Sequence, residues 1–193
     1  MGAEYELKYR ADAACQTAVR EAYPGHWEQL CMQTTYYDTP CGSLSAKRYM
    51  LRKRQENGVS VCTLKTPGKG NERGEWEVRC EHITTATSEL CKLNVPDDLA
   101  DLCAEGLVPV CGAEFTRQAH ILELSGCTAE LALDSGVLFG KKGELPLCEI
   151  ELELISGSPE ALNAFAEVFA AKYGLEAETK SKFARALALY KEV

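Results

Sequence analysis

The chain has 193 residues and a formal net charge of −8, with 46% hydrophobic and 26% charged residues. This composition is ordinary for a globular protein, and no apolar run approaches the ~20 residues that a membrane-spanning helix needs. The acidic balance argues against broad nucleic-acid binding, which requires a basic exterior, and the length suits one domain over residues 1–193.

The first predicted strand, residues 3–10, carries its charges on one face. Glu4, Glu6 and Lys8 lie on the same side because successive side chains of a strand point to opposite faces. Carboxylates at two-residue spacing repel one another unless something cationic or polar lies between them. A divalent metal, basic side chains and water each meet that need, and one strand does not decide among the three.

The next predicted elements are a helix at about 11–23, a strand at 27–38 and a hairpin at 48–66. The dipeptide Asn57-Gly58 favours a two-residue type I′ turn, which fixes the strand pairing outward from the turn. In that register Arg52, Arg54 and Lys65 share one face, and the other face is mostly apolar. This hairpin therefore presents a basic face, opposite in sign to the carboxylates of the first strand.

Further along come a strand at 75–80, two short helices near 88–93 and 97–105, and strands at 108–124, 128–139 and 145–155. A turn at Gly140–Gly143 can close a symmetric hairpin in which Asp134 faces Glu149 and Glu130 faces Glu153. Directly opposed like charges destabilise a sheet by up to ~1 kcal/mol per pair, an arrangement that makes sense around a bound cation. A slipped register with a bulge would separate these carboxylates instead.

Ser158-Pro159-Glu160 begins a helix that runs to Tyr173, and a last helix is predicted at about 180–190. An antiparallel sheet of about eight strands that is apolar under its helices and charged on its other face protects its edges most simply by closing. We therefore predict an α+β fold: a closed eight-stranded antiparallel β-barrel, or tunnel, with the helices packed outside. An acidic protein with a basic inner lining suits a small, highly charged anion that arrives with its own metal.

Ten cysteines are scattered along the chain without C-x-x-C pairs. Cys62, Cys80 and Cys148 fall on apolar strand faces, so we interpret them as small core residues of a protein in a reducing compartment. Because no secretory signal precedes the first predicted strand, we expect a cytoplasmic protein.

Glu4-x-Glu6-x-Lys8 resembles the E-x-E-x-K signature of the CYTH domains, also called triphosphate tunnel metalloenzymes. The resemblance runs through nearly the whole chain, over Tyr36-Tyr37-Asp38-Thr39, Leu51-Arg52-Lys53-Arg54, Thr63-Leu64-Lys65, Arg73-Gly74-Glu75-Trp76, Arg117, Glu130, Asp134, Glu149, Glu151, Glu153, Ser181-Lys182 and Arg185. It implies an eight-stranded tunnel in which carboxylates hold Mg²⁺ or Mn²⁺ and basic residues hold a triphosphate group.

The resemblance also assigns roles to residues. The implied metal ligands are Glu4, Glu6, Glu130, Asp134, Glu151 and Glu153. The implied phosphate-binding residues are Lys8, Arg52, Arg54, Lys65, Arg117, Lys182 and Arg185. The predicted catalytic residues are Glu4, Glu6, Lys8, Lys65 and Glu151. Arg10, Arg79 and Lys180 are weaker candidates because each lies near the end of an element, and Glu75 is predicted either to anchor the basic residues or to touch the metal.

The expected activity is metal-dependent hydrolysis of inorganic triphosphate to pyrophosphate and phosphate, because the charged lining is complete and no extra module for recognising a base is evident. Three alternatives stay open: hydrolysis of thiamine triphosphate, a class IV adenylyl cyclase activity, and a polyphosphate or nucleotide sensor that binds without turnover. The expected partner is a small triphosphate, with no nucleic acid and no membrane. The oligomeric state is open between monomer and homodimer.

Overall fold

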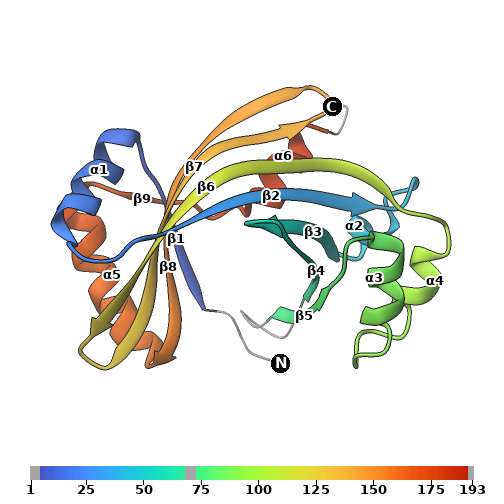
Figure 1. Ribbon diagram of the computed structural model, residues 1–193, viewed down its shortest axis with the longest axis horizontal. Coiled ribbons are helices and arrows are strands. Elements are labelled where there is room, and N and C mark those ends of the chain that lie inside the picture. The colour runs from blue at the N-terminus through green and yellow to red at the C-terminus, as the bar shows by residue number, and fades with distance from the viewer. Residues whose placement is uncertain (1–4, 68–72, 191–193) are drawn as a thin grey trace.

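The computed structural model describes residues 5–67 and 73–190, and its strands form one curved antiparallel sheet (Figure 1). Within these residues the sheet has nine strands in the order β5-β4-β3-β2-β6-β7-β8-β1-β9. The strands are β1 Glu6–Arg10, β2 Glu28–Asp38, β3 Met50–Glu56, β4 Val59–Pro67, β5 Arg73–Arg79, β6 Val108–Leu124, β7 Cys127–Gly140, β8 Gly143–Gly157 and β9 Glu176–Ala177. The helices are α1 Ala13–Ala22, α2 Ser43–Ala46, α3 Ile83–Leu90, α4 Leu99–Cys103, α5 Pro159–Tyr173 and α6 Lys182–Ala188.

The prediction of a closed eight-stranded barrel is wrong for the described residues, because the sheet has nine strands and two open edges. β5 pairs only with β4, and the two-residue strand β9 pairs only with β1. On its outer side β1 pairs with β9 at Tyr9 and Arg10, and no pairing of the described strands joins β1 to β5. Closure was predicted because the open edges of a sheet need protection against pairing with other chains. Here charged residues alternate along the edge strand β5 and give that edge part of this protection without closure.

The hairpin of β3 and β4 has the predicted register. Asn57 and Gly58 both adopt positive φ angles, 47° and 87°, as a type I′ turn requires. Arg52 lies opposite Thr63, and Glu56 opposite Val59. The basic face of this hairpin is therefore confirmed.

The symmetric hairpin of β7 and β8 is also confirmed. Gly140 pairs with Gly143, which places Asp134 opposite Glu149 and Glu130 opposite Glu153. A register shift does occur in this pair of strands, between Thr128 and Ala129, but it lies beyond both carboxylate pairs.

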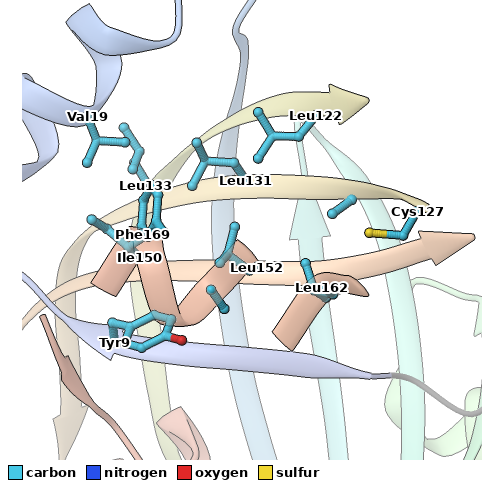
Figure 2. Close-up of a cluster of buried hydrophobic side chains, with 12 residues drawn as sticks. Tyr9, Val19, Leu122, Cys127, Leu131, Leu133, Ile150, Leu152, Leu162 and Phe169 are labelled. Atoms are coloured by element: carbon cyan, nitrogen blue, oxygen red, sulfur yellow. The ribbon is translucent and has the colours of Figure 1, made fainter. Parts of the chain in front are cut away.

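Four helices cover the convex face of the sheet. Figure 2 shows the cluster beneath α1 and α5, where Val19 and Phe169 pack against Leu133 and Ile150. On the other half of the sheet, α3 and α4 contribute Leu90 and Leu99 to a second cluster on Leu51 and Leu64. Full burial of one such leucine contributes about 2 kcal/mol. The apolar outer face was predicted, and both clusters confirm it.

The last helix departs from the prediction that all helices lie outside. α6 packs on the concave face, where Phe183 and Ala186 join Tyr36, Phe115 and Leu138 in a third buried cluster. The rings of Tyr36 and Phe183 are 4.9 Å apart. The inner face is thus charged over only part of its area, because one part of the concavity is filled by apolar side chains and α6.

The segment between β2 and β3 contains the short helix α2. The buried carboxylate of Asp38 accepts hydrogen bonds from the backbone N–H groups of Thr39, Leu44 and Ser45 at 2.8, 2.9 and 3.2 Å. These bonds hold α2 beside the end of β2. No described helix is both long and apolar enough to cross a membrane. All ten cysteines are free thiols.

Candidate functional site

A cavity of about 600 Å³ opens on the concave face of the sheet. Its charged lining consists of Glu6, Lys8, Arg48, Arg52, Arg54, Lys65, Arg117, Glu151, Glu153 and Lys182. These residues come from β1, β3, β4, β6, β8, α6 and the segment that follows α2. Strands that are far apart in the sheet order meet at one cavity because the sheet curves (Figure 1).

The cavity has two walls of opposite charge. β3 and β4 supply Arg52, Arg54 and Lys65. On the other side, β1 and β8 supply three carboxylates, Glu6, Glu151 and Glu153. Such a pair of walls can bind an anion and a cation together.

A buried group of ions lies at the edge of the acidic wall. One carboxylate oxygen from each of Asp134, Glu149 and Glu151 lies within 4.8 Å of the others, close enough to hold one metal ion. In this structure the ammonium of Lys182 contacts all three, at 2.9 Å from Asp134, 2.8 Å from Glu149 and 2.5 Å from Glu151. Lys182 therefore lies within reach of the same three carboxylates that could bind a metal.

Two arginines complete this group. The guanidinium of Arg117 donates from Nε and one terminal nitrogen to the two oxygens of Asp134, each at 2.8 Å, and it also donates to Glu151. Arg185 donates to Glu149. Burial alone would raise the pKa of Glu151, but the charges of Lys182 and Arg117 outweigh burial and hold that pKa well below its usual range. Three carboxylates and three cations thus balance in charge.

Two further carboxylates, Glu6 in the cavity and Glu130 outside its lining, have raised pKa values. Burial, with the charge of Glu151 adding to it, raises the pKa of Glu6 to about 7, although Lys8 lies 3.7 Å away and opposes the rise. Burial likewise raises the pKa of Glu130, against the opposing charge of Arg117. These carboxylates would be stabilised by an additional cation, which is the condition that a divalent metal would satisfy.

In the basic wall neighbouring cations repel one another, although each of them also pairs with a carboxylate. Burial, with the charge of Arg52 adding to it, lowers the pKa of Arg54. Arg54 donates to the hydroxyl of Thr34 at 3.2 Å and lies 6.0 Å from the ring centre of Phe115, while Lys182 lies 5.3 Å from the same ring. An anion bound beside these cations would relieve their mutual repulsion.

The structure brings most of the predicted site residues together, with a few exceptions. Glu4 lies outside the described residues. Three predicted residues do not line the cavity: Asp134 and Glu130 pair with Arg117, and Arg185 pairs with Glu149. Among the weaker candidates, Arg10 pairs with Glu178 at 2.9 Å, whereas Arg79 and Lys180 are exposed and away from the cavity. Glu75 lies 3.1 Å from Lys65, an arrangement that favours the anchoring role.

Several contributors were missed by sequence reasoning. Gln16 of α1 donates from its amide to the backbone carbonyls of Asp134 and Glu149, both at 2.9 Å, and so fixes the backbone that carries two of the carboxylates. Ser45 and Arg48 line the cavity. Alternation along strands could not reveal these residues, because they lie on a helix and in the segment that follows a short helix.

The chain belongs to the CYTH domain family, which matches residues 2–187. The inorganic triphosphatase of Haemophilus influenzae is 31% identical to it over 144 residues, which make up 72% of this chain and 40% of that relative. The chain thus spans less than half the length of this relative.

Two solved structures share the fold. The PH1819 protein of Pyrococcus horikoshii aligns with a TM-score of 0.63 at 24% identity, over 96% of this chain and 98% of that one. HpAC1 from Hippeastrum, which is described as having a dominant triphosphatase activity, aligns with a TM-score of 0.64 at 21% identity, over 97% of this chain and 96% of that one. The predicted family resemblance is confirmed.

Proposed function

We propose that this protein is a metal-dependent hydrolase that cleaves inorganic triphosphate to pyrophosphate and phosphate. The observation that carries the proposal is one cavity on the concave face in which a wall of arginine and lysine faces a wall of glutamates. The Haemophilus relative is named an inorganic triphosphatase, and HpAC1 is described with a dominant triphosphatase activity, so both support the same class of reaction.

The basic wall would bind the phosphoryl groups. Phosphoryl transfer requires neutralisation of the phosphoryl oxygens and a water held in line with the leaving oxygen. Arg52, Arg54 and Lys65 would neutralise one side of the chain of phosphates, and the lowered pKa of Arg54 favours an anion beside it. Lys8 and Lys182 would contact the phosphoryl oxygens from the acidic side, where Lys8 is placed by β1 and Lys182 by α6.

The acidic wall would hold the metal. Carboxylate oxygens are the ligands that Mg²⁺ and Mn²⁺ prefer, and Glu6, Glu151 and Glu153 present them to the cavity, with Glu4 as a further proposed ligand. A metal bound there would supply positive charge to the phosphoryl oxygens and would lower the pKa of a bound water. Asp134 binds Arg117 and Lys182 through ion pairs, so we assign it a supporting role that orients these two cations. Glu130, 3.5 Å from Arg117, would share that role.

A comparison of substrates tests the proposal. The purified protein is given Mg²⁺ or Mn²⁺ and, in parallel, tripolyphosphate, thiamine triphosphate and ATP, and the release of phosphate and of cyclic AMP is measured. We expect the highest kcat/KM for tripolyphosphate. Preference for thiamine triphosphate, formation of cyclic AMP, or tight binding of all three without any product would each reject the proposal.

A further inference from the structure

A buried glutamine links the helix α1 to the strands that carry the buried ion pairs. Gln16 and Val19 are the buried residues of α1, a helix on the convex face of the sheet, opposite the cavity. Gln16 is only 9% exposed. Burial of a carboxamide costs free energy unless its polar atoms are hydrogen-bonded, and an apolar side chain would be enough for packing alone. The hydrogen bonds of Gln16 must therefore offset that cost.

The carboxamide of Gln16 binds both strands of the β7–β8 hairpin. Its Nε2 donates to the backbone carbonyl oxygens of Asp134 on β7 and Glu149 on β8, both at 2.9 Å. Its Oε1 accepts from the hydroxyl of Ser135 at 2.6 Å. A flipped amide would place Oε1 against two carbonyl oxygens, neither of which can donate, so the contacts allow one orientation. Gln16 thus joins β7 to β8 at one level of the sheet.

That level is where the sheet carries opposed carboxylates. Asp134 lies directly opposite Glu149, and both side chains are fully buried. Directly opposed like charges destabilise a strand pair, and a donor shared by the two backbone carbonyls holds the strands together at this point. The backbone there also sets the place of two cations of the cavity. Lys182 contacts both carboxylates, and Arg117 binds Asp134 through two hydrogen bonds.

We propose that Gln16 is a positioning residue for triphosphate binding. By joining β7 to β8 behind the sheet, it holds the carboxylates that orient Lys182 and Arg117 in the cavity. Gln16 does not line the cavity, so it acts through these residues and contacts no substrate. The inference rests on the proposed function, in which Lys182 contacts the phosphoryl oxygens.

Two variants of α1 separate positioning from packing. Tripolyphosphate is titrated calorimetrically into wild-type protein, Gln16→Met and Val19→Ala with EDTA present, and kcat and KM are then measured with Mg²⁺ below the unfolding temperature of each variant. Gln16→Met keeps the length of the side chain and removes its donors. Val19→Ala is the matched control, because Val19 is buried on the same helix and packs against Leu133 and Ile150, the residues next to Asp134 and Glu149, but cannot form a side-chain hydrogen bond.

Gln16→Met should weaken tripolyphosphate binding roughly tenfold, as for loss of a partner that orients a ligand-binding group, and kcat/KM should fall by a similar factor. Val19→Ala leaves a cavity and should lower Tm, but it should change the affinity by less than about twofold. Ser135→Ala removes the hydroxyl that orients the carboxamide, so it should weaken binding by a smaller factor than Gln16→Met. This third variant keeps the test decisive if Gln16→Met does not fold.

Equal effects of Gln16→Met and Val19→Ala on the affinity would show that Gln16 only packs, and so would an unchanged affinity in Ser135→Ala if Gln16→Met is unfolded. Suppose instead that the variants weaken binding as expected, but that wild-type protein releases no phosphate from tripolyphosphate with Mg²⁺. The proposed hydrolase is then refuted, and the positioning role in binding stands. Wild-type protein that binds no tripolyphosphate would overturn both.

Discussion

Removal of the Lys182 ammonium is expected to destabilise the protein strongly. Lys182→Met keeps a long unbranched side chain but leaves Asp134 and Glu149, both with fully buried side chains, without one of their cations. Breaking a buried ion pair by removal of one partner typically costs about 3–5 kcal/mol, because the remaining charge stays desolvated. We therefore expect the free energy of unfolding at pH 7, measured by urea denaturation in EDTA, to fall by roughly 3 kcal/mol or more.

Two controls isolate the charge. Lys180→Met alters an exposed lysine two residues away and should change stability by no more than about 0.5 kcal/mol. In the double variant Lys182→Met/Glu149→Gln, part of the lost stability should return, because one uncompensated carboxylate is removed together with its cation. A loss below ~1 kcal/mol in Lys182→Met, or no recovery in the double variant, would show that the carboxylates do not depend on this lysine.

Three further predictions concern the acidic wall, the basic wall and the packing of the sheet. Because the pKa of Glu6 is raised from 4.5 to about 7, the folded metal-free protein holds a proton that the unfolded chain has lost, so unfolding free energy should fall as pH rises from 4.5 to 7. Glu6→Gln should reduce this slope, to which the raised pKa of Glu130 also contributes, and should be more stable than wild type at pH 8 by roughly 1–3 kcal/mol; an unchanged slope in pH-dependent denaturation contradicts the assignment. Arg52→Ala should raise the KM for tripolyphosphate about tenfold to a hundredfold, whereas Lys53→Ala, on the opposite face of the same strand, should leave steady-state kinetics unchanged. Gly136→Ala should lower thermal stability by about 2 kcal/mol, since its Cβ would lie 2.1 Å from the carbonyl oxygen of Glu114, and a calorimetric scan with no change in Tm would exclude this close approach.

The local pairing of strands could be predicted because short-range signals fix it. Asn57-Gly58 favours a type I′ turn, and from it the positions of Arg52 and Lys65 follow by counting. The hairpin at Gly140–Gly143 was predicted in the same way, including the opposition of Asp134 and Glu149. Alternation along the strands did not decide whether a metal, basic side chains or water lies between the carboxylates. The resemblance to the CYTH family implied a metal there and a triphosphate beside the basic residues.

Features that depend on distant contacts could not be predicted. Whether the sheet closes depends on what occupies the outer side of β1, and the two-residue strand β9 carries no pattern long enough to detect. The inward position of α6 depends on Phe183 meeting Phe115 and Tyr36, residues that read as ordinary apolar positions in the sequence. The contacts of Lys182 with three carboxylates likewise arise only in the folded chain.

The central claim is that the two charged walls act together on one triphosphate. The most direct measurement is phosphorus NMR of tripolyphosphate mixed with the protein and Mg²⁺, compared with the Glu151→Gln variant. The account predicts that wild-type protein converts tripolyphosphate to pyrophosphate and phosphate in equal amounts, while the variant, which loses a carboxylate of the acidic wall, leaves the tripolyphosphate signals almost unchanged. Unaltered tripolyphosphate with wild-type protein, or equal turnover by the variant, would contradict it.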